Sequence, residues 1–183
     1  MEAQVEVRQA AHEDLNAVLA VLDNAAAWLQ SIGLREQWPA SFSQDPAFVH
    51  LAVQLIARNQ LFVASAGEDV AGCFRLDSEQ RPFWPHGGEA MFLLTLAVKR
   101  EYAARGVGGA MLEWACEFAR MNGKSELRLD CWAGNQRLRR YYRDAGFEWQ
   151  RDAEISVPDD NPSVPPQNRR RAFEVSLFVK RLT

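Results

Sequence analysis

The residues best suited to chemistry in this chain of 183 residues form a glycine-rich turn, Arg105-Gly106-Val107-Gly108-Gly109. The turn lies between the apolar run Met91 to Val98 and an amphipathic segment that begins at Val107. A strand, a tight turn and a helix start in this order leave backbone N–H groups without partners at the positive end of a helix dipole. Glycine also keeps side chains out of the path of an approaching anion. The turn therefore predicts a site that holds a phosphate group against the backbone.

A glycine pair before a helix is also ordinary turn chemistry, so the surrounding sequence has to distinguish the possibilities. A dinucleotide-binding fold would place its glycine turn after the first strand, whereas here the turn follows the fourth expected strand. A nucleotide triphosphatase loop would continue with lysine and a hydroxyl residue, but Ala110 and Met111 stand there. Neither of these two phosphate-binding folds fits.

Hydrophobic periodicity predicts the elements that must position the turn. Apolar or alternating runs predict strands at residues 5–8, 61–65, 70–76, 91–98, 127–131, 148–156 and 171–180. Apolar residues at helical spacing predict helices from about Asp14 to Gly33, from Pro46 through Ile56, from Val107 to Asn122 and from Asn135 through Ala145. The order of strand, two helices, three strands, helix, strand, helix and two strands predicts one α/β domain over residues 1–183.

A second group of residues follows the turn, with Asn135, then Tyr142 seven positions later, then the pair Gly146-Phe147. Together with the turn it resembles the GCN5-related N-acetyltransferase (GNAT) family from about Met91 to Phe147. The family's acetyl-CoA loop begins with glutamine or arginine, and Ala103 departs from that pattern, which leaves Arg105 as the nearby cation. The resemblance implies the GNAT acyl-CoA N-acyltransferase fold. That fold is a mixed, mostly antiparallel sheet of about seven strands, the fourth and fifth splayed apart, flanked by about four helices.

The resemblance also implies which residues hold acetyl-CoA. They are the strand end, the glycine turn and the start of the last helix: Leu96, Ala97, Val98, Ala104, Arg105, Gly106, Val107, Gly108, Gly109 and Asn135. Asparagine is a favoured helix cap, so Asn135 is expected to serve both purposes.

The same resemblance places Tyr142 as the general acid near the thioester sulfur, because family members often have tyrosine at this point. The alternative is a core aromatic, since Leu138, Tyr141, Tyr142 and Ala145 share one helical face. For the general base the candidates are Asp130, late in the fifth strand, and Glu89, before the fourth. Each could equally be a carboxylate at a strand end.

Aromatic residues fall in the segments that the family fold would bring to the acceptor pocket. Trp38 and Phe42 lie between the first two helices, Trp84 before the fourth strand and Trp132 after the fifth, and the proline-rich segment 157–168 is a third pocket loop. Rings favour an acceptor with an apolar or cationic body. The alternative is that these rings fill the core.

The composition limits the kinds of molecule that the protein is expected to bind. A net charge of −3 gives no long-range attraction to nucleic acid, and no apolar stretch reaches the length that spans a bilayer. Cys73, Cys116 and Cys131 show no metal or redox spacing, and the three histidines are scattered, so no metal site is expected. The N-terminus lacks signal-peptide features, which favours the cytoplasm. The alternating last strand could pair across a two-fold axis to form a homodimer if it lies at a sheet edge.

The sequence therefore predicts an acetyl-CoA-dependent N-acetyltransferase that acts on a primary amine, most simply of a small molecule, by direct attack. None of the three cysteines is placed as a nucleophile. Two alternatives stay open: a CoA-responsive binding module without catalysis, and transfer to oxygen or of a longer acyl group.

Overall fold

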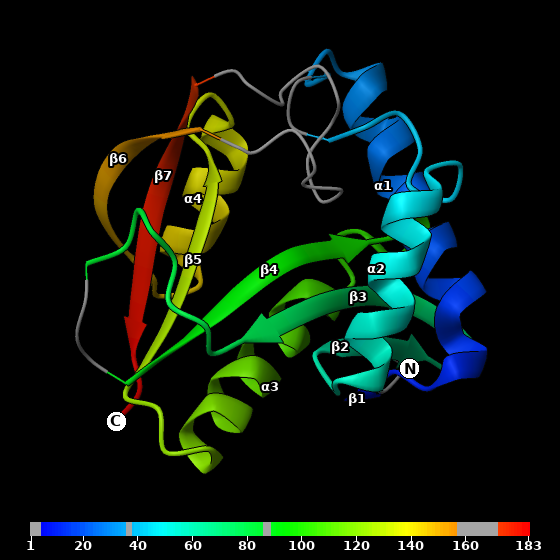
Figure 1. The fold of residues 1–183 in the computed structure, drawn as a ribbon, viewed down its shortest axis with the longest axis horizontal. Helices are drawn as coiled ribbons and strands as arrows, with labels where there is room; N and C mark the ends of the chain where they lie inside the picture. Colours follow the sequence, from blue (N-terminus) through cyan, green and yellow to red (C-terminus); the bar gives the residue numbers. More distant parts are fainter. Residues whose placement is uncertain (1–4, 36–37, 86–88, 157–171) are drawn as a thin grey trace.

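A seven-stranded mixed sheet forms the centre of the computed structural model, which describes residues 5–35, 38–85, 89–156 and 172–183 (Figure 1). The strand order is β1-β2-β3-β4-β5-β7-β6. Within the described strands, β4 and β5 run parallel and all other neighbours are antiparallel. This confirms the mixed, mostly antiparallel sheet expected from the sequence. The strands are β1 (Val5–Gln9), β2 (Leu61–Ala66), β3 (Asp69–Asp77), β4 (Ala90–Val98), β5 (Glu126–Trp132), β6 (Glu148–Ser156) and β7 (Ala172–Arg181).

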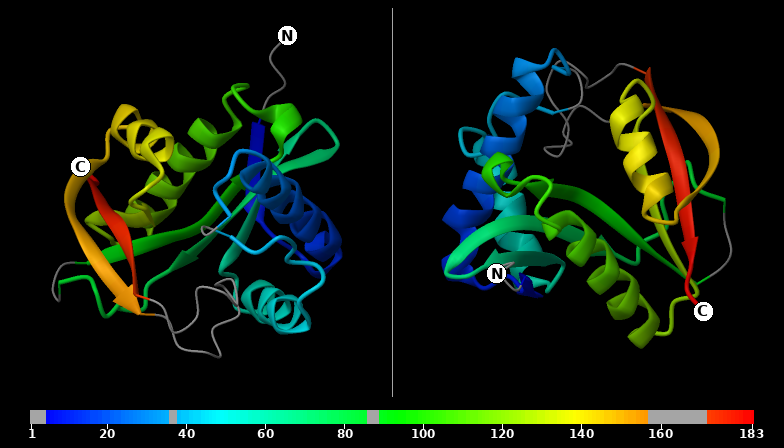
Figure 2. Two further views of the ribbon diagram at one scale, coloured as in Figure 1. Left: turned by 90° about the horizontal axis from the view of Figure 1, so that it is seen from above. Right: turned by 180° about the vertical axis from the view of Figure 1, so that it is seen from behind.

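Four α-helices cover the two faces of this sheet, as expected. Helices α1 (Leu15–Ser31) and α2 (Pro46–Ala57) lie on one face, and α3 (Val107–Met121) and α4 (Gln136–Asp144) lie on the other (Figure 2). Two short 3-10 helices, η1 (His12–Asp14) and η2 (Arg100–Tyr102), precede α1 and α3. The predicted start of α2 is confirmed, because the Asp45 side chain accepts a hydrogen bond from the N–H of Ala47 and Pro46 occupies the first turn.

The parallel pair β4–β5 is short. It runs from Ala90 opposite Glu126 to Leu93 opposite Leu129, and beyond that point the two strands separate. Figure 1 shows them side by side where they begin and diverging toward their ends. The sheet is thereby divided into a half made of β1 to β4 and a half made of β5, β7 and β6, which confirms the expected splay of the fourth and fifth strands.

Strand β4 also contains an irregularity just after the separation begins. Leu94 pairs with Arg75 and Ala97 pairs with Cys73, so the two residues Thr95 and Leu96 stand opposite one residue of β3. Thr95 has a φ of +54°, a left-handed conformation that is costly for a β-branched residue. A bulge of this kind leaves one residue outside the hydrogen-bond ladder and bends its strand.

Separate apolar cores lie on the two faces of the sheet. On the α3 and α4 face, four aromatic rings pack at centroid distances of 5.0 to 6.0 Å: Phe62, Phe74, Trp114 and Phe118. On the other face, α1 and α2 pack on β2 and β3 through buried residues such as Val18, Leu22 and Ala52. The two cores fix α1 and α3 on opposite sides of β4.

The position of β7 decides whether the last strand can pair across a two-fold axis. That pairing was expected only if the strand lay at a sheet edge, and it lies instead between β5 and β6, paired on both sides. The edge strands are β1 and β6, so a dimer formed by sheet extension would use one of those. The segment 157–168, expected to help form the acceptor pocket, lies outside the described residues.

Gly72 of β3 provides a test of how α3 packs on the sheet. A Cβ added there would lie 2.7 Å from the sulfur of Met111 on α3 and 2.9 Å from the carbonyl oxygen of Ala97 on β4. We expect Gly72→Ala to lower the free energy of unfolding by about 1–3 kcal/mol, because the backbone oxygen cannot move aside. The measurement is urea unfolding followed by circular dichroism.

Gly109 on α3 is the matched control, since a Cβ there meets no atom within 4 Å. Gly109→Ala should be neutral or stabilise by up to about 1 kcal/mol, as alanine does in a helix. Equal stability of the two variants would contradict the packing of α3 described above.

Candidate active site

The glycine turn lies at the start of α3 and leaves its first backbone N–H groups free of partners in the described chain. Gly106 precedes the helix with a φ of +81°, a conformation that glycine adopts without strain. The first helical hydrogen bond runs from the N–H of Ala110 to the carbonyl of Gly106. The N–H groups of Val107, Gly108 and Gly109 are therefore available to an anion, and a Cβ at Gly106 or Gly109 meets nothing within 4 Å.

Cations and strained backbone surround this turn. Ala104 has a φ of +61°, which brings the chain around into α3. Arg105 is exposed and its guanidinium lies 5.7 Å from the ring of Tyr102. Arg105 thus supplies a positive charge near the free N–H groups. The family pattern has a polar side chain at the start of this loop, and this chain has Ala103 there.

Helix α4 approaches the start of α3 from the other half of the sheet. A Cβ built on Gly108 would lie 2.5 Å from the hydroxyl oxygen of Tyr141 and 3.8 Å from Val98 at the end of β4. A side chain at this position would therefore displace the Tyr141 hydroxyl. Figure 2, seen from behind, shows α3 and α4 flanking the region where β4 and β5 have separated.

Tyr142 follows Tyr141 on α4 but points into the interior. It is 5% exposed and packs on Tyr141, Phe147 and Phe178 at centroid distances of 5.6 to 6.0 Å. Its hydroxyl forms no hydrogen bond with a described residue. Burial, together with the charges of Cys131 and Asp130, raises the pKa of the Tyr142 phenol, so that it stays protonated at neutral pH. Asn135, at the start of the same helix, is confirmed as the cap, since its Oδ1 accepts from the N–H of Leu138 at 3.0 Å.

Asp130 is the first residue of β5 beyond the pairing with β4. Its neighbours Leu129 and Cys131 pack in the core on the α3 and α4 side, so Asp130 faces the opposite side of the sheet, toward α1 and α2. Burial raises its pKa to about 6, and Arg81 works against that rise. A carboxyl group with this pKa can exchange a proton near neutral pH.

Three charged residues that sequence reasoning missed lie on the same face as Asp130. Arg75 and Asp77 alternate with core residues of β3, and Arg81 follows in the next loop. One oxygen of Asp77, Oδ2, accepts from Nη2 of Arg75 at 2.5 Å and from Nη2 of Arg81 at 2.8 Å. The signal that could have found this cluster is a pair of charges two residues apart in an otherwise apolar strand.

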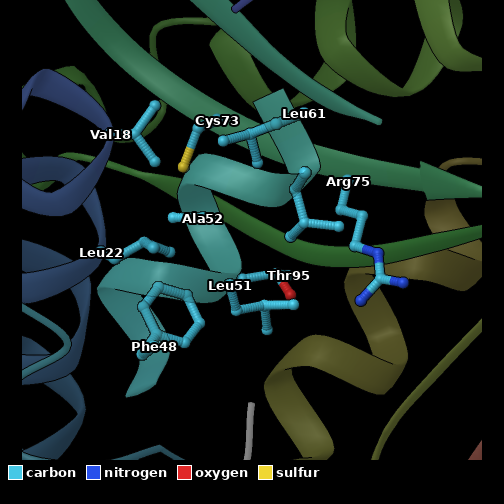
Figure 3. Close-up of a pocket in the computed structure, with 10 residues that line it drawn as sticks. Val18, Leu22, Phe48, Leu51, Ala52, Leu61, Cys73, Arg75 and Thr95 are labelled. Atoms are coloured by element: carbon cyan, nitrogen blue, oxygen red, sulfur yellow. The ribbon is translucent and has the colours of Figure 1, made fainter. Parts of the chain in front are cut away.

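A small apolar pocket opens beside this cluster (Figure 3). Its wall is formed by α1, α2 and β2 residues, with Cys73 and Arg75 of β3 and Thr95 of the β4 bulge at its floor. Figure 3 shows the guanidinium of Arg75 pointing away from the apolar wall. The wall residues are Val18, Leu22, Phe48, Leu51, Ala52, Leu55 and Leu61.

The aromatic residues expected to line the acceptor pocket have different positions. Phe42 is 1% exposed and packs against Phe48 at 4.6 Å, so it fills the core between α1 and α2. Trp38 is partly buried and packs edge-on against Phe42 at 5.3 Å. Both rings belong to the core that supports the pocket wall.

The two remaining tryptophans lie near β5. Trp84 is 3% exposed and packs on Phe92 and on the guanidinium of Arg128, so it also lies in the interior. Trp132 is partly buried at the end of β5, two residues beyond Asp130 and therefore on the same face. Of the four aromatic candidates, Trp132 lies closest along the sheet to Asp130.

Glu89 is not brought together with the other site residues. Its carbonyl accepts from the N–H of Ser125 at 2.8 Å, which places it at the closed end of the β4–β5 pair. The strands separate at the other end, several residues away along β4. At about 3.3 Å per residue, this distance is too long for the Glu89 carboxylate to serve a reaction at the separation.

The described residues give little support for a cysteine nucleophile, a metal site or a membrane span. Burial raises the pKa of Cys73 and of Cys131 to about 12, which disfavours a thiolate nucleophile at either residue. No three His, Cys, Asp or Glu side chains in the described residues gather as ligands for a metal ion. None of the helices described here is both long and apolar enough to cross a bilayer.

Solved structures with this architecture are acetyltransferases. An N-acetyltransferase from Staphylococcus aureus aligns with a TM-score of 0.69 and 18% identity, covering 98% of this chain and 99% of that one. A ribosomal-protein-alanine N-acetyltransferase from Brucella melitensis gives a TM-score of 0.68 and 23% identity, covering 97% and 99%. An acetyltransferase from Salmonella typhimurium, solved with its cofactor acetyl-CoA, gives 0.66 and 15%, covering 98% and 94%.

Sequence comparison reaches the same family. The chain is 32% identical over 147 residues to YesJ, an uncharacterised N-acetyltransferase from Bacillus subtilis, covering 76% of this chain and 79% of YesJ. The family model described as "Acetyltransferase (GNAT) family" matches residues 21–147, more than half of the chain. The protein is thus an acetyltransferase that belongs to the GNAT family.

Proposed function

We propose that the protein transfers the acetyl group of acetyl-CoA to the primary amine of a small molecule by direct attack. The observation that carries this proposal is the separation of β4 from β5, with the free start of α3 and the buried Tyr142 on one face of the sheet and the ionisable carboxyl group of Asp130 on the other. The thioester of acetyl-CoA would supply the activated acetyl group. The remaining roles fall to residues of this chain.

The start of α3 fits the phosphates of CoA. Free N–H groups at Val107, Gly108 and Gly109, open space at two glycines, and Arg105 nearby form the site that a pyrophosphate needs. Ala104 would shape the turn. The end of β4, residues Leu96, Ala97 and Val98, lacks a partner strand on the β5 side, so its backbone can pair with the amide groups of the CoA arm. Asn135 would lie beside that arm at the start of α4.

Asp130 would accept the proton that the ammonium group of the acceptor must lose. The neutral amine forms a bond to the acetyl carbon while the carbon–sulfur bond breaks, and Tyr142 donates its proton to the departing thiolate. The amide nitrogen then loses its extra proton, and one proton returns to Tyr142, which restores the phenol. Because burial keeps Tyr142 protonated, the phenol is in the state required of a proton donor. Backbone N–H donors at the Thr95 bulge would stabilise the negative charge that develops on the carbonyl oxygen of the acetyl group.

Glu89 has no role in this proposal, because it lies at the closed end of the strand pair. Phe42 and Trp84 are buried in the interior and would act as supports, whereas Trp132 would contact the acceptor. Trp38 would act through its contact with Phe42. No cysteine is needed, which agrees with transfer that has no covalent enzyme intermediate.

Tyr142→Phe tests the proton donor, with Tyr141→Phe as its matched control. We expect Tyr142→Phe to lower kcat about 100-fold or more, the range of general acid catalysis, with little change in affinity for acetyl-CoA. Tyr141→Phe removes the hydroxyl beside Gly108 on the same helix, so its effect should fall on affinity for acetyl-CoA and most of kcat should be kept. The measurement is release of CoA thiol with a panel of primary amines, together with calorimetric titration of acetyl-CoA.

The other results of this assay have distinct meanings. Unchanged kcat in Tyr142→Phe would make the ring a core residue only. Tight binding of acetyl-CoA with no thiol release to any amine would favour the non-catalytic binding module. Preference for an alcohol acceptor, or for a longer acyl-CoA, would favour the remaining alternative.

The pH dependence of kcat tests Asp130. Burial raises its pKa to about 6, so the active carboxylate form increases as pH rises through 6. We expect kcat to rise with an inflection near pH 6 and then to level off. Asp130→Asn should lower kcat about 100-fold and remove that inflection, because the amide cannot accept the proton. A variant with the wild-type rate and pH profile would exclude Asp130 as the base.

A further inference from the structure

The cluster of Arg75, Asp77 and Arg81 carries more positive than negative charge at a partly enclosed position. Asp77 has a side chain only 1% exposed, and it serves both arginines through its Oδ2 atom. Its other oxygen, Oδ1, accepts from the backbone N–H of Glu79. One carboxylate therefore balances two guanidinium groups, and a buried charge without a counter-charge is costly.

Both arginines have hydrogen-bonding capacity left over. Each guanidinium has five N–H donors, and the Nε of Arg75 and the Nε of Arg81 are buried without a partner. Glu79 attracts Arg75 at longer range, but it is exposed to solvent and forms no ion pair with either arginine in the described structure. The surplus of charge and of donors points to an anion that completes the cluster.

The cluster lies where an acceptor molecule would bind. Arg75 pairs in register with Leu94 of β4, and Leu93 pairs with Leu129, so Arg75 and Asp130 are about two strand spacings apart, roughly 10 Å between Cα atoms. Both side chains point to the same face, and Arg81 is close enough to Asp130 to influence its pKa. This face therefore offers a negative group at Asp130 and a positive group at the two arginines.

The phosphates of CoA do not account for this cluster. Their proposed site is the start of α3, on the opposite face of the sheet from Arg75 and Asp77. The apolar pocket in Figure 3, which Arg75 and Thr95 help to line, has a free volume of about 10 Å³ and is too small for a side chain of the acceptor. An acceptor that fits Asp130 and the two arginines has an ammonium group and an anionic group.

We infer that the acceptor is an amine that also carries a carboxylate, as in an amino acid, and that Arg75 and Arg81 bind the carboxylate. This inference rests on the proposed function. Arginine suits the role because its planar fork matches a carboxylate, and such charge-assisted hydrogen bonds are stronger than neutral ones. The ammonium group would then lie toward Asp130.

The test compares acceptors that differ only in the acidic group. The first set is leucine, leucinamide and isopentylamine, and the second is phenylalanine, phenylalaninamide and 2-phenylethylamine. With the full chain, we expect kcat/KM for the amino acids to exceed that for the amide and the plain amine by about tenfold or more. Equal or better turnover of the uncharged partners would overturn the inference.

Variants of Arg75 show whether the cluster causes this preference. Arg75→Gln should lower kcat/KM for the amino acids about 10- to 100-fold more than for the plain amines, and Arg75→Lys should recover part of that difference. Arg120→Gln, an exposed arginine on α3, is the control and should change nothing. A loss that is equal for acids and plain amines would assign Arg75 a purely structural role, with folding checked by circular dichroism.

Ligand binding separates failure of the inference from failure of the proposed function. If no amine releases CoA thiol, the proposed function fails, and the anion site is then tested by thermal unfolding with leucine and with isopentylamine in the presence of CoA. A rise in Tm with leucine alone, lost in Arg75→Gln, would support the site independently of turnover. No rise with leucine, or the same rise in the variant, would overturn it.

Discussion

The structure depends on the early end of the pairing between β4 and β5. After four residue pairs the parallel strands separate, and each leaves backbone groups on its inner side without a partner strand. Unpaired N–H and C=O groups in the middle of a sheet need another partner, and the arm of an acyl-CoA molecule is rich in amide groups that can supply one. The core beneath α3 spans both halves of the sheet, because Leu127 and Leu129 of β5 and Phe178 of β7 belong to the same cluster as Phe62 and Phe74 of β2 and β3. The two halves are therefore joined on this face by one core, which also contains Tyr142.

The two faces of the sheet carry different parts of the proposed site. The α3 and α4 face carries the helix start for phosphates and the buried phenol of Tyr142, and the α1 and α2 face carries Asp130 and the arginine cluster. Cofactor and acceptor would therefore approach the separation from opposite sides and meet at its apex. This arrangement explains why Tyr142 and Asp130, from different faces, are close enough for the charge of one to influence the pKa of the other. It also allows the acceptor side to change without disturbing the phosphate site.

The features predicted well from the sequence are those that short-range physics determines. The glycine turn before α3, the cap at Asn135 and the strand and helix pattern follow from local backbone and periodicity rules, and the order of elements matched the family fold. What could not be predicted depends on contacts between distant segments. Whether Phe42 and Trp84 face solvent or core is decided by the way the chain packs, and both are buried. The shared carboxylate of Asp77 and the bulge at Thr95 arise from pairing between strands, for which a single sequence gives no direct signal.

The central claim is that acetyl-CoA occupies the separation of β4 and β5 with its phosphates at the start of α3. Hydrogen exchange measured with and without acetyl-CoA tests this most directly, because amide groups that bind a ligand exchange more slowly. The account predicts slower exchange in the segments 94–98 and 105–109 and little change at the far edge strands β1 and β6. Slower exchange elsewhere, with these two segments unchanged, would contradict it.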